Sequence, residues 1–298
     1  MPQVGSIDAA VIGAGPAGIS AALQLRRHGL TCVVFERERI GGSLNDAFLL
    51  RNVVGKPEGV SGKELVNELY ASATNVNMMM TEILSVELSQ GSFLLKHSKG
   101  ETLSRSVILA SGLSPRRLED SVVSPKAQAA VHYSLGEILG HPIRRAAVIG
   151  GGDVAIDFAC SLRAAGREVT VLMHSKYPVA NHFVLDDAVR LGARMWGQFN
   201  TTHVEASGPR LRVVAADGRT LDCDAVLVAI GKERKVPFLS GTMKNCVKPS
   251  GPLSVTTSQP GLFLCGDILD EGRRYYHHAL GTGLMAAESV FEYLAQGG

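Results

Sequence analysis

Apolar residues form a short continuous run near the start of the chain, then a spaced pattern, then a second run. In "DAAVIGAGPAGISAALQLRRHGLTCVVFERE" (residues 8–38), the first run ends in glycines and the second ends in an acid. Short apolar runs bounded by turn residues are typical of buried strands, and the spaced segment between them is typical of an amphipathic helix. The pattern predicts a strand, a tight turn, a helix and a second strand.

The same plan recurs in the middle of the chain, in "AAVIGGGDVAIDFACSLRAAGREVTVLMHSK" (residues 146–176). Residues 89–112 and 211–231 alternate as hairpin strands do, and the second of these has Asp217-Gly218 as its turn. Near the C-terminus, a strand runs into Gly266-Asp267 and a long amphipathic helix follows. We therefore predict an α/β fold with two Rossmann-like three-layer domains.

Length and composition limit the possible partners. The chain has 298 residues, which is enough for two domains, and a net charge of +2 with 19% charged residues. No basic stripe indicates nucleic acid, and no apolar run approaches the roughly 18 residues of a membrane span. The N-terminal apolar stretch is interrupted by glycines and lacks a cleavage site, so we expect no signal peptide and a cytoplasmic location.

Five cysteines stand at positions 32, 160, 223, 246 and 265, without a C-x-x-C pair. Their odd number argues against a secreted disulfide framework, and with the histidines they form no zinc-like set, so we predict no metal. Four of them fall in strand or helix patterns, where a buried and inert thiol is expected. Cys246 lies in a loop beside lysines, and it is the candidate reactive thiol.

The first turn has the pattern G-x-G-x-x-G at Gly13, Gly15 and Gly18. In a strand-turn-helix context the first glycine makes the turn, the second lets a pyrophosphate approach the backbone, and the third lets the helix pack closely. Glu36 ends the second strand, where a carboxylate accepts hydrogen bonds from a ribose. These residues predict a dinucleotide whose phosphates lie at the helix N-terminus.

Two further segments resemble the FAD domain of the low-molecular-weight thioredoxin reductase family. They are "IGGSLND", followed by Asn52, and "TSQPGLFLCGDILDEGRRYYHHALGTG". The resemblance implies FAD, with Asp267 bonded to its ribityl chain or a nearby hydroxyl and with the N-terminus of the last helix at the pyrimidine edge. The implied FAD-binding residues are Gly13, Gly15, Pro16, Ala17, Gly18, Glu36, Gly42, Ser43, Leu44, Asn52, Ile83, Ala110, Gly112, Gly266, Asp267, Arg274, Tyr275 and Tyr276.

The second turn has the variant G-x-G-x-x-A at Gly150, Gly152 and Ala155. In the resembled family this turn belongs to an NAD(P)H domain inserted into the FAD domain. The resemblance therefore implies an FAD domain of residues 1–114 and 243–298 around a nucleotide domain of residues 115–242. Asp153 and Asp157 match the family's acidic positions. The alternative is an inserted fold that has kept its packing glycines and lost its ligand.

The choice of nucleotide is open, because this chain departs from the arginines that hold the 2′-phosphate of NADPH in relatives. The corresponding stretch is "MHSKYPVANH", with Ser175, Lys176 and Ala180 at the three arginine positions. A phosphate is usually held by more than one cation. NADH, weak use of NADPH, or neither nucleotide are all compatible with a single Lys176.

A larger departure concerns the redox-active dithiol. Where thioredoxin reductases have S-Y-C-x-x-C-D, this chain has "HYSLGE", with Ser134 and Glu137 at the cysteine positions. Neither residue can cycle between thiol and disulfide. The chain is thus also similar to the ferredoxin/flavodoxin-NADP reductases of the same fold, which pass electrons from flavin to an external acceptor. We predict an FAD-dependent oxidoreductase of this type, with no conventional catalytic acid, base or nucleophile.

Two other functions remain open at this point. One is a disulfide reductase that uses differently placed cysteines, such as Cys246. The other is a flavoprotein that takes electrons from a protein donor and uses no pyridine nucleotide. Tyr275, Tyr276, His277 and His278 either stack on or protonate the flavin, or merely cover the helix start. The acceptor is an unidentified molecule or small redox protein, and relatives with this fold are commonly homodimers.

Overall fold

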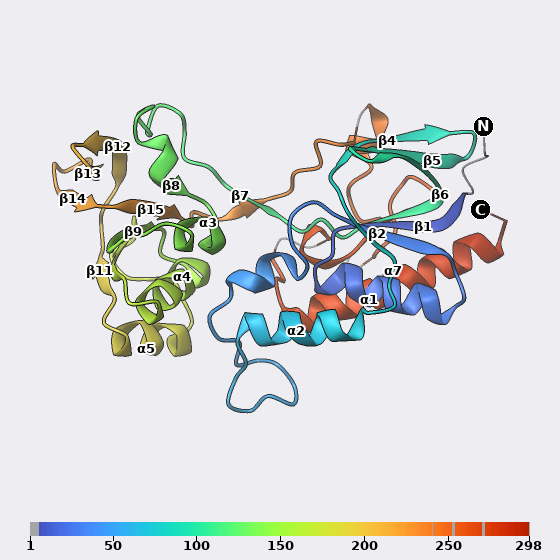
Figure 1. The fold of residues 1–298 in the computed structure, drawn as a ribbon, viewed down its shortest axis with the longest axis horizontal. Coiled ribbons are helices and arrows are strands. Elements are labelled where there is room, and N and C mark those ends of the chain that lie inside the picture. Colours follow the sequence, from blue (N-terminus) through green and yellow to red (C-terminus); the bar gives the residue numbers. More distant parts are fainter. Residues whose placement is uncertain (1–5, 240, 252–253, 270–271, 298) are drawn as a thin grey trace.

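The chain folds into two domains that lie side by side and are joined by two extended crossings (Figure 1). The computed structural model describes residues 6–239, 241–251, 254–269 and 272–297. The first and last elements, β1 (Ile7–Ile12) and α7 (Tyr276–Ala295), belong to the same domain. The other domain is therefore inserted into it, and the predicted α/β class with two Rossmann-like domains is confirmed.

The first domain is built on a sheet with the strand order β3-β2-β1-β6-β5-β4, in which β17 also pairs with β6. Strands β3, β2, β1, β6 and β17 run parallel, whereas β4 and β5 form an antiparallel arm with β6. The parallel strands read as continuous apolar runs because both of their faces are buried. Their bounds are β2 (Cys32–Glu36), β3 (Met78–Met80), β4 (Ile83–Ser89), β5 (Ser92–His97), β6 (Gly100–Leu109) and β17 (Leu262–Leu264).

Helices α1, α2 and α7 lie together on one side of this sheet (Figure 1). Helix α2 begins at Gly62, and its N-cap Ser61 forms a capping box in which Ser61 and Glu64 satisfy each other's backbone amides. The core beneath the helices contains fully buried Phe35, Phe93 and Leu25. The helical elements of this domain are α1 (Pro16–Arg27), η1 (Gly42–Asp46), α2 (Gly62–Ser72), α6 (Thr242–Asn245), η3 (Gly266–Ile268) and α7.

The second domain repeats the plan with a parallel sheet of order β11-β10-β9-β15-β8 and a separate antiparallel sheet β12-β13-β14. Gly218, in the turn between β13 and β14, has a φ of +84°, which suits the predicted hairpin. The strands are β8 (Val131–His132), β9 (Arg145–Ile149), β10 (Glu168–Leu172), β11 (Arg194–Trp196), β12 (Thr201–Ser207), β13 (Arg210–Ala215), β14 (Thr220–Cys223) and β15 (Ala225–Val228). The helices are η2 (Gln128–Ala130), α3 (Leu135–Leu139), α4 (Asp153–Ala164) and α5 (His182–Arg190).

The two crossings pair with each other as short antiparallel strands, β7 (Ser114–Pro115) and β16 (Lys232–Glu233). Leu239 is fully buried in the first core, so the chain has returned to the first domain by this residue. The exact domain boundaries stay predictions: residues 1–114 and 243–298 for the FAD domain, and residues 115–242 for the nucleotide domain. No helix in the described part of the chain is long and apolar enough to cross a membrane.

Helices α1 and α7 pack closely because small residues face each other across their contact. A Cβ at Gly283 would lie 2.2 Å from the carbonyl oxygen of Ala17, whereas a Cβ at Gly281 would meet no atom within 4 Å. Ser20 adds a hydrogen bond from its hydroxyl to the carbonyl oxygen of Leu280, at 2.7 Å. This approach holds the start of α1 against the start of α7.

Replacing these two helical glycines should have opposite effects on stability. Gly281→Ala should raise the free energy of unfolding by up to about 1 kcal/mol, because alanine is the better helix former. Gly283→Ala should lower it by about 1–3 kcal/mol, because the helices must separate to admit the methyl group. Urea unfolding of both variants, with the same FAD content, gives the measurement; a Gly283→Ala protein as stable as wild type would contradict the packing described.

Candidate functional site

Two glycines of the first turn are required because the backbone packs closely around them, and the third faces open space. A Cβ at Gly13, whose φ is +111°, would lie 2.4 Å from the carbonyl oxygen of Ala110. A Cβ at Gly18 would lie 1.9 Å from the carbonyl oxygen of Gly13. At Gly15, directly before α1, a Cβ would meet no atom within 4 Å. The turn therefore leaves room for a ligand at the helix N-terminus, where phosphates bind well.

Two segments distant in sequence meet this turn. A Cβ at Gly42, at the start of η1, would lie 3.8 Å from the Cα of Gly15. A Cβ at Gly266, whose φ is +73°, would lie 2.8 Å from the Cβ of Ala17. The three motifs that the sequence assigned to one ligand are thus brought together around the start of α1.

Glu36 ends β2 beside the same turn and is nearly buried. Its carboxylate accepts hydrogen bonds from the backbone amides of Ala14 at 2.9 Å, Glu38 at 2.8 Å and Arg39 at 3.2 Å. A carboxylate has about four lone-pair positions, so about one acceptor position remains. This geometry fits a ribose hydroxyl as the fourth partner.

The other predicted FAD residues lie in several parts of the first domain. Ser43 and Leu44 belong to η1, and Pro16 is the first residue of α1. Ile83 begins β4 two residues after Thr81, whose amide donates to the carbonyl oxygen of Glu36 at 2.7 Å. Asn52 is exposed on the loop before α2, and Gly112 follows β6 with a φ of +64°.

A charged cluster surrounds Asp267 in η3, and one of its members was missed from the sequence. Burial raises the pKa of the Asp267 carboxyl, and the cations of Lys232 and Arg274 oppose that rise. Burial lowers the pKa of the Lys232 ammonium, which lies in the crossing strand β16. The signal available in the sequence was the lysine directly after the strand "AVLVAIG", at the start of "KERK", where the chain returns to the first domain.

The aromatic and imidazole side chains around the start of α7 have separate surroundings. Tyr276 packs against the first core, whereas Tyr275 is 57% exposed. The His277 imidazole Nε2 accepts from the backbone amide of Val54 at 2.9 Å. The His278 Nε2 is buried and has no hydrogen-bond partner among the described residues. Tyr276 and His277 thus cover the helix start, and His278 is the member whose ring nitrogen is available to a ligand.

The second glycine turn has the same geometry as the first. A Cβ at Gly150 would lie 2.2 Å from the carbonyl oxygen of Ala229, and Ala155 packs against it. A Cβ at Gly152, directly before α4, would come no nearer than 3.8 Å to an atom, the carbonyl oxygen of Val179. The Asp153 carboxylate accepts from both the backbone amide and the side-chain amide of Asn181, each at 2.8 Å. This turn too leaves space at a helix N-terminus.

The segment after β10 contains Lys176, which is exposed and has its ammonium 5.2 Å from the centre of the Tyr177 ring. Another cation, Arg219, reaches the neighbouring residues 197–198 and donates to the carbonyl oxygen of Gly197 at 3.3 Å and to that of Gln198. Its guanidinium also pairs with Asp217 at 2.8 Å. Arg219 is therefore already neutralised by a carboxylate.

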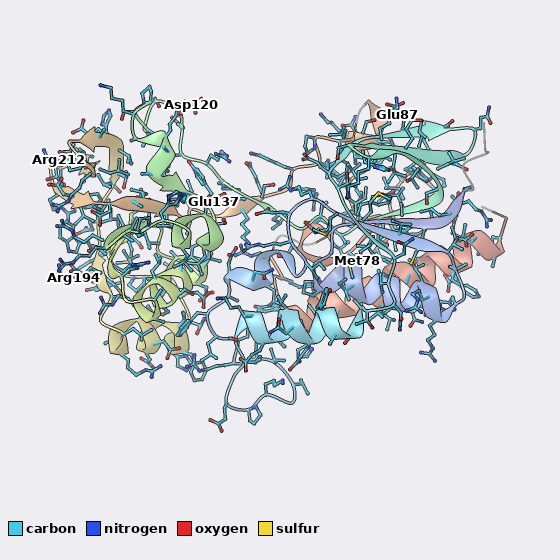
Figure 2. All side chains as sticks on the ribbon, viewed as in Figure 1. Met78, Glu87, Asp120, Glu137, Arg194 and Arg212 are labelled. Carbon is cyan, nitrogen blue, oxygen red and sulfur yellow. The ribbon has the colours of Figure 1, made fainter. Side chains whose placement is uncertain are left out.

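At the positions of the family's dithiol the chain has a helix cap. The Ser134 hydroxyl accepts from the amide of Glu137 at 3.3 Å, and the Glu137 carboxylate accepts from the amide of Tyr133 at 2.9 Å. Together they satisfy two amides at the start of α3, as in a capping box. Figure 2 shows Glu137 on the part of the second domain that lies toward the first.

All five cysteines lie in the described part of the chain, and none of them forms a disulfide there. Cys32, Cys160, Cys223 and Cys265 are buried, as predicted. Burial raises the pKa of the Cys160 and Cys223 thiols to about 12 and also raises that of Cys265. Cys246 is partly exposed after α6. Four of the five thiols are thus poor nucleophiles at neutral pH.

Comparison with known proteins identifies the family. Residues 7–283 match the family model described as pyridine nucleotide-disulphide oxidoreductase. The chain belongs to this family. It is 30% identical to the thioredoxin reductase of Chlamydia trachomatis, over 95% of this chain and 97% of that protein. It is 31% identical to the bifunctional thioredoxin reductase/thioredoxin of Mycobacterium leprae, where the match covers 96% of this chain but 65% of that longer protein.

Solved structures agree on the fold. The thioredoxin reductase of Lactococcus lactis in its FR conformation has a TM-score of 0.84 at 20% identity, covering 98% of this chain and 100% of that one. The thioredoxin reductase of T. acidophilum also has a TM-score of 0.84, at 21% identity and with 97% and 99% coverage. The chain is therefore a thioredoxin reductase-like, flavin-dependent oxidoreductase that uses FAD and NADH or NADPH.

The open position at Gly15 gives a variant that separates ligand binding from folding. Gly15 has a φ of −74°, which alanine also adopts, and its Cβ would meet no protein atom. Gly15→Ala should therefore leave the stability of the FAD-free protein unchanged and weaken FAD binding roughly tenfold or more. Urea unfolding without FAD and a fluorescence titration with FAD measure the two effects; unchanged FAD affinity would show that the phosphates lie elsewhere.

Lys232→Met tests the charged cluster around Asp267. Removing the ammonium should move the pKa of Asp267 further upward, so FAD binding should weaken and should fail at a higher pH than in wild type as the carboxyl takes up a proton. The measurement is the FAD dissociation constant as a function of pH. Lys235→Met is the matched control, since Lys235 pairs with Glu233 on the same crossing at 2.8 Å; equal pH profiles for the two variants would contradict the prediction.

Proposed function

We propose that this protein transfers electrons from a reduced nicotinamide dinucleotide through FAD to an external acceptor, without a dithiol of its own. The observation that carries the proposal is the helix cap made by Ser134 and Glu137 at the place where relatives have two cysteines. The two open glycine turns support the two dinucleotides. The buried state of four of the thiols supports an exit for electrons that involves no sulfur.

The roles of the residues follow from their positions. Bound FAD supplies a ring that accepts a hydride equivalent and gives up electrons. The amides at the start of α1 and Glu36 hold the pyrophosphate and ribose of FAD. Asp267 fixes the ribityl side, while the charges of Lys232 and Arg274 oppose the rise in the pKa of its carboxyl that burial causes. The start of α4, with Gly152, holds the second dinucleotide. The chain thus binds and orients the reactants, and none of its residues acts as nucleophile.

We infer NADH as the better reductant. A 2′-phosphate needs a cation pair or a planar arginine, and the segment after β10 offers Lys176 alone at the three arginine positions of relatives. Arg219 lies beside this segment, but its guanidinium is bonded to Asp217 and to two carbonyl oxygens. NADPH would have to break these bonds to recruit it.

The acceptor is proposed to be an external molecule or a small redox protein, because thioredoxin reductases act on such a protein and this chain lacks the internal relay. A homodimer is expected from the family resemblance, and the cytoplasmic location expected from the sequence stays a prediction. The residues that would meet the acceptor stay unassigned.

A disulfide reductase with displaced thiols is the second candidate, because Cys246 is partly exposed. It requires a second thiol, and the other four cysteines are buried. Titration of accessible thiols before and after flavin reduction distinguishes the two functions. Two new thiols per chain would support the disulfide reductase, and an unchanged count would support the external acceptor.

Anaerobic mixing of the FAD-loaded protein with each reduced nicotinamide tests the proposed function. Bleaching of the flavin absorbance should be faster and should need less nucleotide with NADH than with NADPH. Flavin that stays oxidised with both nucleotides would contradict the proposal and favour a flavoprotein that receives electrons from a protein donor.

A further inference from the structure

Two residues of the first domain reach across to helices α4 and α5 of the second domain. The backbone amide of Phe48 donates to the Asp157 carboxylate at 2.9 Å, and the Phe48 ring packs against the second core. The Arg51 guanidinium donates to both carboxylate oxygens of Asp187, at 2.6 Å and 3.0 Å. We call Phe48, Arg51, Asp157 and Asp187 the interdomain latch.

The loop that carries Phe48 and Arg51 is bonded to the rest of the first domain at two points. Before it, the Asn45 side-chain amide donates to the carbonyl oxygens of Ile40 at 2.8 Å and Gly42 at 3.0 Å. Within it, Leu50 exchanges two backbone hydrogen bonds with Val60, just before α2, at 2.8 Å and 2.9 Å. A contact made by this loop therefore restrains the first domain as a whole.

The acceptors of the latch are equally well fixed in the second domain. Asp187 has a side chain that is 5% exposed, and the hydrogen bond from Arg51 is the main cause that lowers its pKa. Arg190 also donates to Asp187 at 2.8 Å, but from within α5. Asp157 is partly buried and accepts the amides of Phe48 and Leu49. A bidentate guanidinium–carboxylate pair and a carboxylate that accepts two amides both restrict orientation strongly.

We propose that the interdomain latch is a positioning device that sets the orientation of the nucleotide domain relative to the FAD domain. Asp157 lies on α4 about one turn after Gly152, so the latch grips the helix whose start holds the second dinucleotide. Apart from the latch and its neighbouring contacts, the domains are joined by the crossings β7 and β16. This orientation presents the nicotinamide to the flavin, a role that rests on the proposed function.

The latch has a built-in dependence on pH. Burial raises the pKa of Asp157 to about 7, and the amides of Phe48 and Leu49 oppose that rise. Opening the latch exposes the carboxyl to water, so its pKa falls toward the ordinary value and a proton is released. Protonation of Asp157 therefore stabilises the closed latch. This stabilisation is fully present well below the ordinary pKa of a carboxyl and is lost as the pH rises through about 7.

Other charged or titratable groups face Asp157. They are Asp153 and Cys160 on α4 and Asp187 on α5, while Arg51 and Arg190 act on Asp187 and Cys160 beside it. Asp153 and Asp187 reinforce the raised pKa of Asp157. The pH dependence that belongs to Asp157 is therefore isolated by replacing Asp157 itself.

Hydrogen exchange of the FAD-loaded protein tests the latch directly, at the amides of Phe48 and Leu49. Arg51→Gln should raise their exchange rates about tenfold or more, because the charged pair that keeps the latch closed is lost. Arg190→Gln is the matched control: it removes another donor to Asp187 without touching the first domain, and exchange at residues 48 and 49 should stay within about twofold of wild type. Equal exchange in the two variants would overturn the proposal.

Asp157→Asn supplies the pH test and keeps the shape of an acceptor. In wild type the exchange of the two amides, corrected for its intrinsic pH dependence, should increase as the pH passes through about 7. In the asparagine variant that increase should vanish. A pH dependence that persists in Asp157→Asn would show that another group governs opening.

Anaerobic flavin reduction then connects the latch to the reaction. If NADH reduces the flavin, Arg51→Gln should lower the rate constant of reduction several-fold at saturating nucleotide and leave the nucleotide affinity unchanged, and Arg190→Gln should leave both unchanged. A changed affinity with an unchanged rate constant would contradict the positioning role. If neither nucleotide reduces wild-type flavin, the proposed function fails, while the exchange measurements still decide whether the latch exists.

Discussion

The absence of a side chain at a few glycines is the constraint on which both domains depend. At Gly13 and Gly150 the strand end and the following turn lie so close to a neighbouring carbonyl oxygen that a Cβ would overlap it. At Gly15 and Gly152 the same turns open onto free space at a helix N-terminus. Close packing behind each turn and open space in front of it together make two dinucleotide sites.

The proposed chemistry differs from that of a thioredoxin reductase because of the residues at one helix start. Ser134 and Glu137 satisfy backbone amides of α3 and therefore have a structural role that a pair of cysteines would perform less well. The remaining cysteines are held mostly inside cores, where burial keeps their thiols protonated. Together these features favour direct transfer from the flavin to an external acceptor.

The sequence predicted the features that depend on local pattern and left out those that depend on distant pairing. The glycine turns, the start of α2 and the four buried cysteines follow from spacing and apolar runs. That Leu239 enters the first core is likewise set by distant packing and by no local pattern. The pairing of Arg51 with Asp187 and the approach of Lys232 to Asp267 join residues far apart in the chain, and no local pattern encodes them.

Counting the electrons that the purified FAD-loaded protein accepts tests the central claim most directly. In an anaerobic titration with dithionite, a flavin without a partner dithiol takes up two electrons per chain. A flavin in exchange with a redox-active disulfide takes up four. Two electrons per chain is the predicted result, and four would contradict the dithiol-free route.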